Sequence, residues 1–138
     1  AGVEPRSLLL VGFSASFAAK LADTFGSEIG KRWGRRPVLI TTLRSVPPGT
    51  EGAISLAGTL ASAAGSVLMT LVMWQLQLLP SISVSLVVML IGLLATLAES
   101  LLGALAQDRF RWLSNELVNA LQTLLAAVMA MLWLGGRI

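Results

Sequence analysis

Two long uncharged stretches, separated by Pro80 and Ser81, constrain this chain more than any other feature. They run from Ile54 to Leu79 and from Ile82 to Ala98. About 20 apolar residues are enough for an α-helix to cross the ~30 Å hydrocarbon core of a bilayer. Because the turn at Pro80 is so short, the second helix must return antiparallel beside the first. The sequence therefore predicts a membrane protein with a hairpin of two transmembrane helices.

The rest of the chain fits two further transmembrane helices. Of the 138 residues, 55% are hydrophobic and 12% are charged, whereas about 25% are charged in a soluble domain. A helix over about 8–29 follows Pro5, with Ser7 as its N-cap, and a helix over about 116–134 follows the sequence LSNE. We expect one all-α, polytopic domain over 1–138, with spans at about 8–29, 54–79, 82–105 and 116–134.

Small residues in the second predicted helix indicate close helix packing. Gly58, Ser62 and Ser66 are spaced by four residues. This small-xxx-small spacing lets two helix backbones approach each other closely. We expect this face of the helix to pack against a neighbouring helix.

The composition excludes several kinds of site. The chain has no Cys and no His, so disulfides are excluded and zinc or haem sites are not expected. The net charge of +3 suits loops that meet lipid headgroups, and we expect no nucleic-acid partner. The N-terminal AGVEPRS has neither an initiator Met nor the apolar core of a signal peptide, which indicates a processed or incomplete chain.

Basic side chains mark one side of the membrane. The loop after the first predicted helix contains Lys31, Arg32, Arg35, Arg36 and Arg44, and the loop after the third contains Arg109 and Arg111. The connection at Pro80 contains none. With four alternating crossings, both basic loops lie on one side, which the positive-inside rule makes the cytoplasmic side, or the stromal side in a plastid.

Polar residues within the predicted spans lie toward this basic end. At 100° per residue they form one stripe on each of three helices. The stripes are Lys20, Asp23, Thr24, Ser27 and Lys31 with Glu28 at the edge; Thr96, Glu99, Gly103 and Gln107; and Asn115, Asn119 and Gln122. We expect the three stripes to line one polar site at the cytoplasmic or stromal end of the helices.

Ionised side chains within a span cost several kcal/mol unless they are paired or hydrated, so they indicate a functional site by default. A purely structural alternative exists, because Lys20 can neutralise Asp23, and Glu28 can pair with Lys31 or another base of the following loop. Glu99 has no oppositely charged residue close to it in the sequence. This unpaired acid favours a functional site.

The loop over residues 34–52, GRRPVLITTLRSVPPGTEG, adds a second signal. It combines basic side chains, hydroxyls and a Pro-Pro-Gly turn before the start of a helix. Phosphate oxygens bind to such groups. Beside a carboxylate-lined cavity, the pattern is that of phosphoryl transfer, in which carboxylates hold Mg²⁺, the metal bridges phosphate oxygens, and Lys or Arg neutralise the remaining charge.

Four segments resemble a known family. KLADTFGSEIGK, LITTLRSVPPGTEGAISLAGTLAS, LAESLLGALAQ and LSNELVNALQTLLAA are similar to motifs of the integral-membrane phytyl-phosphate kinases of plastids and cyanobacteria. The resemblance runs from about Phe17 to Ala127. It implies an enzyme of the plastid envelope or thylakoid, or of a bacterial inner membrane. Such an enzyme would phosphorylate phytyl monophosphate for tocopherol and related prenyl-lipid synthesis, using a nucleoside triphosphate, with CTP favoured because of a remoter similarity to CTP-using lipid kinases.

The resemblance also implies roles for individual residues. The catalytic set is Asp23, Glu28, Lys20 and Glu99, of which Asp23, Glu28 and Glu99 would bind Mg²⁺. Contacts to substrate or nucleotide phosphate are expected from Lys31, Arg44, Thr50, Gly52, Asn115 and Asn119. Membrane lipids and the prenyl phosphate are the expected partners.

Two departures from the family pattern keep a second hypothesis open. The first is length, because family members have additional N-terminal spans. The second concerns two positions: relatives usually have Asp at the position of Glu99, and plastid-type relatives often have Glu at the position of Ala57. The alternative is a non-catalytic structural or accessory subunit of a larger membrane complex or oligomer, such as a photosynthetic complex, with chlorophyll or carotenoid bound to its helices. A transporter is the third possibility, although no inverted repeat is evident.

Overall fold

The computed structural model describes residues 4–107, 109–110 and 112–136. Within them four helices are long and apolar enough to cross a membrane. They are α1 (Pro5–Trp33), α2 (Leu56–Gln75), α3 (Ile82–Leu102) and α4 (Asn115–Gly135), and a short π-helix, η1 (Gly103–Gln107), continues α3. These helices confirm the predicted all-α, polytopic fold.

Serine side chains begin three of the four helices. The hydroxyl oxygens of Ser55, Ser81 and Ser114 each accept a hydrogen bond from the backbone N–H three residues later, at 3.1 to 3.2 Å, as N-caps do. The prediction for α1 is wrong in this respect, because Ser7 lies inside the helix. α1 instead begins at Pro5, a position where the missing N–H of proline costs no helical hydrogen bond.

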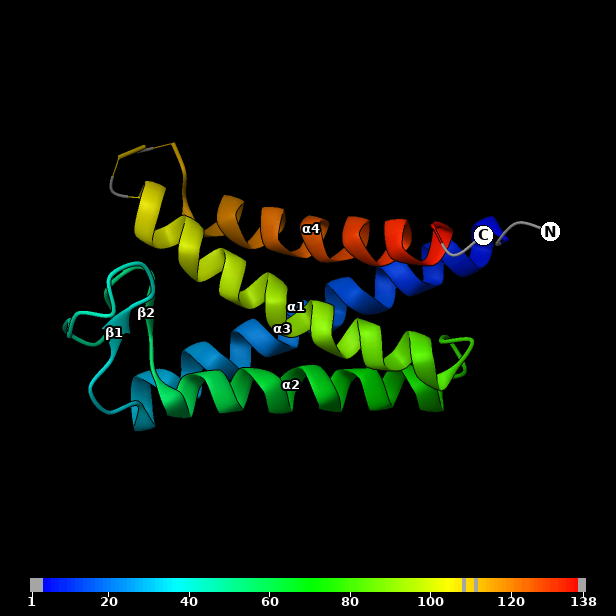
Figure 1. The fold of residues 1–138 in the computed structure, drawn as a ribbon, viewed down its shortest axis with the longest axis horizontal. Helices are drawn as coiled ribbons and strands as arrows, with labels where there is room; N and C mark the ends of the chain where they lie inside the picture. The colour runs from blue at the N-terminus through cyan, green and yellow to red at the C-terminus, as the bar shows by residue number, and fades with distance from the viewer. Residues whose placement is uncertain (1–3, 108, 111, 137–138) are drawn as a thin grey trace.

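The long helix α1 runs diagonally through the bundle and contacts the other three helices. Figure 1 shows that its N-terminal half lies beside α4 and its C-terminal half beside α2, while α3 crosses it near the middle. α1 and α4 therefore diverge toward the end of the bundle that carries the basic loops. At this end the α1–α2 pair separates from the α3–α4 pair.

Small residues set the closest approach of α1 and α2. A Cβ added to Gly26 would collide with the Ser62 hydroxyl and lie 3.2 Å from the carbonyl oxygen of Gly58. A Cβ added to Gly30 would lie 3.4 Å from the Gly58 Cα. The predicted packing face of Gly58 and Ser62 is thus confirmed, and its partner is a glycine pair on α1. Ser66 contacts a different helix, because its hydroxyl donates a 2.6 Å hydrogen bond to the carbonyl oxygen of Met89 in α3.

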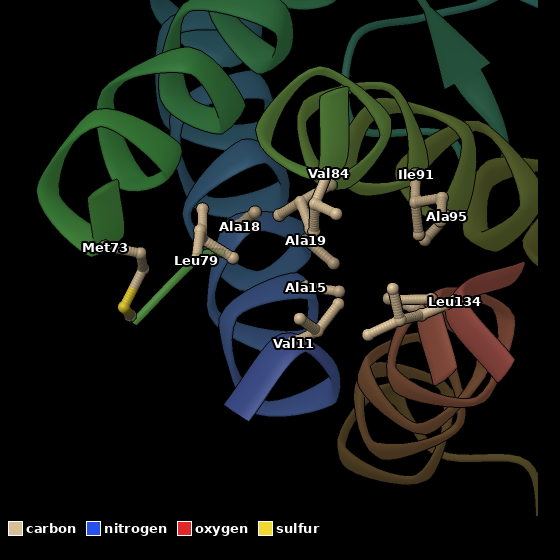
Figure 2. Packing of buried hydrophobic residues seen from close by; sticks show 13 residues of the cluster. Val11, Ala15, Ala18, Ala19, Met73, Leu79, Val84, Ile91, Ala95 and Leu134 are labelled. Carbon is tan, nitrogen blue, oxygen red and sulfur yellow. The ribbon is translucent and has the colours of Figure 1, made fainter. Parts of the chain in front are cut away.

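The apolar core lies away from the basic end and is built largely from alanine and valine. Val11, Ala15 and Ala19 of α1 are fully buried, as are Val88 of α3 and Ala126 of α4. Figure 2 shows side chains of this cluster, among them Ala15, Val84 and Leu134, between α1, α3 and α4, with Leu79 at the turn before α3. Short side chains let the helices cross closely, since without a hydrophobic driving force between helices their association depends on tight packing.

The loop between α1 and α2 contains a two-stranded sheet that the sequence did not indicate. β1 (Val38–Leu39) pairs antiparallel with β2 (Ala53–Ile54). Gly52 precedes β2 with a φ of +79°, and a Cβ there would overlap Ala104 at the start of η1. The close contact between Gly52 and Ala104 therefore holds this hairpin against the end of α3.

Candidate functional site

Three polar side chains from three helices meet at the basic end of the bundle. Asp23 comes from α1, Glu99 from α3 and Asn119 from α4. With its amide nitrogen turned toward the acids, Asn119 donates to Glu99 Oε1 at 3.0 Å and to Asp23 Oδ2 at 3.2 Å. The two carboxyl groups also lie within hydrogen-bonding reach of each other. Two carboxylates at this separation repel unless one is protonated or a cation lies beside them.

Asp23 has two further neighbours on its own helix. The Ser27 hydroxyl donates to Asp23 Oδ1 at 3.5 Å. The Lys20 ammonium lies 3.7 Å from Asp23 Oδ2. The Asp23 side chain is 12% exposed and that of Lys20 is 51% exposed, so the ion pair extends from the buried acid to the outer surface of α1.

The carboxyl pair lies at the wall of a cavity of about 350 Å³. All four helices and the hairpin loop contribute to its lining. The lining residues are Asp23, Gly26, Ser27, Gly30 and Lys31 of α1; Pro37 and Pro48 to Ser55 of the hairpin loop; Gly58 and Thr59 of α2; Thr96, Glu99, Ser100 and Gly103 of α3 and η1; and Asn115 and Asn119 of α4. The cavity therefore lies where the two helix pairs separate.

A buried polar layer lies on the core side of the carboxyl pair. The Gln122 amide nitrogen donates to the carbonyl oxygen of Ala19 at 3.0 Å and to the Thr96 hydroxyl at 3.1 Å. Gln122 is 3% exposed and Thr96 is 8% exposed. These bonds connect α4 to α1 and α3 at the level where α1 begins to diverge from α4.

The turn over residues 47–52 forms one rim of the cavity. The Thr50 N–H and hydroxyl both bond to the carbonyl oxygen of Pro47, at 3.3 and 2.7 Å. Within the part of the chain that the structure describes, the N–H groups of Gly49, Glu51 and Gly52 donate no hydrogen bond. Positive φ angles at Gly49 and Gly52 bend the backbone as in turns that bind anions through their N–H groups.

The helix ends add partial charges to the cavity. The N-termini of α2 and α4 lie at it, through Ser55 and Asn115. The first N–H groups of a helix carry a partial positive charge, and this favours anions. The described lining contains three acids, Asp23, Glu51 and Glu99, and one base, Lys31. An anionic ligand in this cavity would therefore need an additional cation.

The sequence matches a described family over most of its length, as the integral membrane protein family DUF92 covers residues 2–127. The chain belongs to this family. It is 43% identical over 130 residues to an uncharacterized membrane protein of Synechocystis, over 94% of this chain and 50% of the relative. It is 42% identical over 134 residues to Protein VTE6, chloroplastic, of Arabidopsis thaliana, over 95% of this chain and 40% of the relative.

An archaeal relative extends the family further. An uncharacterized membrane protein of Methanocaldococcus jannaschii is 39% identical over 123 residues, which cover 89% of this chain and 50% of the relative. The chain thus spans about half the length of the curated relatives it matches. No solved structure matches it. The cyanobacterial and chloroplast relatives confirm the predicted resemblance, and the chain is an integral membrane protein, as its relatives are.

Most of the residues predicted from the family pattern lie at the cavity. Asp23 and Glu99 form the carboxyl pair, and Lys31, Thr50, Gly52, Asn115 and Asn119 line the cavity. The Thr50 hydroxyl proton is directed at the carbonyl oxygen of Pro47. In this conformation Thr50 shapes the turn, and its contact to phosphate stays a prediction.

Three predicted residues lie elsewhere. Glu28 is 72% exposed and pairs with Lys31 at 3.9 Å on the outer face of α1, because five residues place it about 140° around the helix from Asp23. Lys20 reaches the site only through its ion pair with Asp23. Arg44 lies in the exposed turn after β1, outside the cavity lining.

The predicted metal site of three carboxylates is therefore not formed. Among the described residues, no three acidic side chains come close enough together to hold a metal ion. Asp23 and Glu99 meet, but Glu28 points away from them. In this structure Glu28 therefore does not join Asp23 and Glu99 as a ligand of one metal ion.

Ser27, Thr96 and Gly103 belong to the predicted polar stripes and line the cavity, but several other lining residues were not predicted. Gly26, Ser27 and Gly30 follow Asp23 by three, four and seven residues, so helical spacing places them on the same face of α1 as Asp23. The same rule connects Thr96 and Gly103 to Glu99. Glu51 had no such signal, since it lies in a loop whose path depends on the hairpin.

Proposed function

We propose that this protein is a membrane prenyl-phosphate kinase, which transfers a phosphoryl group from a nucleoside triphosphate to a prenyl monophosphate. The observation that carries this proposal is the Asp23–Glu99 carboxyl pair, held by Asn119 in a cavity beside a turn with unused N–H groups. The resemblance of the sequence to phytyl-phosphate kinases, together with its 42% identity to Protein VTE6, chloroplastic, supports phytyl monophosphate as the acceptor. CTP is the favoured donor.

The charges of the cavity support a requirement for Mg²⁺. Mg²⁺ is commonly bound by one or two carboxylates together with water and substrate phosphates. Asp23 and Glu99 supply two carboxyl groups from different helices, so the residues fit this ion without a third acid. Mg²⁺ held there would supply positive charge that stabilises the phosphate groups during transfer. These two acids would be its protein ligands.

The other walls of the cavity fit the phosphates themselves. The unused N–H groups of Gly49, Glu51 and Gly52 and the N-terminus of α2 can donate to phosphate oxygens. The Lys31 ammonium can compensate their charge. The Ser27 hydroxyl, already bonded to Asp23, holds that carboxylate in its orientation.

The reaction is a displacement at phosphorus. A terminal oxygen of the prenyl monophosphate forms a bond to the γ-phosphorus of the donor. The bond from this phosphorus to the β–γ bridging oxygen breaks, and the nucleoside diphosphate leaves with the electron pair. Catalysis of such a step consists mainly of positioning and charge stabilisation, which the carboxyl pair, the turn and Lys31 can supply.

The decisive experiment is phosphoryl transfer by the purified protein in detergent or lipid. Labelled CTP or ATP is supplied with phytyl monophosphate, with and without Mg²⁺. We expect Mg²⁺-dependent transfer that Asp23→Asn abolishes. Glu4→Gln is the matched control, since it neutralises an exposed acid at the N-terminal end of the same helix, outside the cavity, and it should keep the activity.

Two outcomes would refute the proposal. The absence of transfer from a folded protein with either nucleotide would leave the non-catalytic subunit as the better hypothesis. Equal loss in Asp23→Asn and Glu4→Gln would show that the activity does not depend on this cavity.

A further inference from the structure

A second hollow lies between α1 and α4, and its α1 residues precede those of the cavity by about one to three turns of the helix. It has a volume of about 440 Å³ and is lined by Ser16, Phe17 and Lys20 of α1 and by Thr123, Leu124 and Ala127 of α4. We call it the α1–α4 groove. Its core end is closed where the helices meet, because a Cβ added to Gly12 would lie 2.8 Å from the sulfur of Met131. From there the helices diverge toward the basic end (Figure 1).

The walls of the α1–α4 groove are apolar in spite of two hydroxyl residues. The Ser16 hydroxyl donates to the carbonyl oxygen of Phe13 at 2.8 Å. The Thr123 hydroxyl donates to the carbonyl oxygen of Ala120 at 2.9 Å. Each hydroxyl proton is thus used within its own helix, and carbon atoms dominate the rest of the surface. The rings of Phe13 and Phe17, with centroids 4.6 Å apart, continue this surface along α1.

Lys20 is the charged residue of the groove, and it connects the groove to the cavity. Its ammonium lies 3.7 Å from the carboxylate of Asp23, and Asp23 lines the cavity. An ammonium group at the end of an apolar groove is costly in a membrane unless an anion accompanies it. Asp23 accounts for part of this compensation, but Lys20 remains half-exposed and can meet a second anion.

We propose that the α1–α4 groove holds the apolar chain of the prenyl monophosphate, with the phosphate at Lys20 and directed toward Asp23. This inference rests on the proposed function. The seven residues from Lys20 to Phe13 span about 10 Å of helix, so the groove would hold the part of the chain next to the phosphate, and the remainder would extend into the bilayer. An amphiphile with one anionic end matches both parts of the groove, the carbon walls and the ammonium. A packed apolar helix would match the walls but would offer no second anion to the half-exposed Lys20 side chain.

The test uses a phytyl monophosphate with a photoreactive diazirine in its chain, added to the full chain in lipid nanodiscs. After irradiation, labelled peptides are mapped by mass spectrometry. We expect labels on the segments around Phe17 and Leu124, with unlabelled phytyl monophosphate competing and phytol competing at least ten times less well. Lys20→Gln should weaken the labelling about tenfold, while Lys20→Arg should keep it.

Groove-filling variants supply the matched comparison. Ala127→Phe places a ring in the groove, and we expect at least tenfold weaker labelling. Ala64→Phe makes the same substitution at an exposed position of α2 and should label as the wild type does. Ser16→Leu fills the groove from the other helix, so it tests the same point if Ala127→Phe does not fold.

The outcomes separate this inference from the proposed function. Asp23→Asn should lose transfer and keep the groove labelling. Transfer by a wild-type protein whose labels lie outside the groove, or equal labelling of Ala127→Phe and Ala64→Phe, would overturn the groove and leave the kinase standing. Labelling in the groove without transfer would refute the kinase alone. A groove that excludes the probe because a second copy or another helix fills it would also overturn the inference.

Discussion

The buried amide of Gln122 allows a stability prediction with a definite sign. Its nitrogen makes two hydrogen bonds, at 3.0 Å to the Ala19 carbonyl oxygen and at 3.1 Å to the Thr96 hydroxyl. Its oxygen is buried and has no hydrogen-bond partner among the described residues. The side chain is therefore half satisfied. Replacing it by a side chain of the same length without polar atoms removes a favourable and an unfavourable contribution together.

The two contributions can be compared. Hydrogen bonds between membrane helices average about 0.6 kcal/mol, so two are worth about 1.2 kcal/mol. A buried acceptor without a partner costs about 1–3 kcal/mol. Neither partner of Gln122 is stranded by its removal, since the Thr96 hydroxyl keeps its 3.1 Å bond to Gly92 and the Ala19 carbonyl remains within a helix. We therefore expect Gln122→Met to leave the free energy of unfolding unchanged or to raise it by up to about 2 kcal/mol.

Truncation at the same position should have the opposite effect. Gln122→Ala also removes both hydrogen bonds, but it leaves a cavity between three helices. Loss of a long buried side chain costs about 2–5 kcal/mol when the surrounding helices do not close in. The predicted order of stability is thus Met equal to or above Gln, and Ala well below both. Gln75→Met, at an exposed position of α2, should change stability by less than about 0.5 kcal/mol.

Reversible unfolding in mixed dodecylmaltoside and SDS micelles measures these differences, with the tryptophans as fluorescent probes. The reasoning fails if Gln122→Met destabilises the protein as much as Gln122→Ala does. That result would mean that the Gln122 oxygen has a valuable partner, such as an ordered water molecule, and that the polar layer below the carboxyl pair is fully satisfied.

Three further predictions address the cavity. Asn119→Leu removes both donors to the carboxyl pair, and we expect transfer to fall about 100-fold, equivalent to about 2.7 kcal/mol, without a matching loss of thermal stability. Gly49→Ala and Gly52→Ala both require a left-handed alanine, which costs about 1–2 kcal/mol, but only the Gly52→Ala variant also collides with Ala104. The thermal midpoint of Gly52→Ala should therefore drop further than that of Gly49→Ala. Equal drops would contradict the contact between the hairpin and Ala104. Lys31→Ala should raise KM for the nucleotide several-fold in steady-state kinetics, while Arg44→Ala should leave KM unchanged. A larger rise in KM for Arg44→Ala than for Lys31→Ala would refute the placement of Arg44 outside the cavity.

Helix periodicity and hydropathy were sufficient to predict the transmembrane fold and the core of the site. Long uncharged apolar stretches satisfy their backbone hydrogen bonds in a bilayer by forming helices. The carboxyl pair followed from the same reasoning, since polar residues such as Asp23, Glu99 and Asn119 are costly in a membrane unless they meet each other. Both arguments use local properties of the chain, and the structure agrees with them.

The errors arose where tertiary structure decides. Glu28 was placed at the edge of a polar stripe, but α1 packs so that this edge faces outward and Glu28 pairs with Lys31. Arg44 was assigned to the phosphate loop because the loop was treated as one unit. The pairing of β1 with β2 divides it, so that Gly49 and Gly52 face the cavity and Arg44 does not. No local pattern predicts a pair of two-residue strands.

The position of the site follows from the packing of α1 with α2. Gly26 and Gly30 let α1 approach Gly58 so closely that even a methyl group would be crowded. A helix drawn to α2 at this end must separate from α4, and the separation exposes backbone and side chains that the apolar core cannot cover. Asn119 and Gln122 of α4 bridge the gap with hydrogen bonds at two levels. Gly26 and Gly30 therefore set the direction of α1 at this end, and the tilted helix contributes to both hollows, with Asp23 at the cavity and Lys20 at the α1–α4 groove one turn before it.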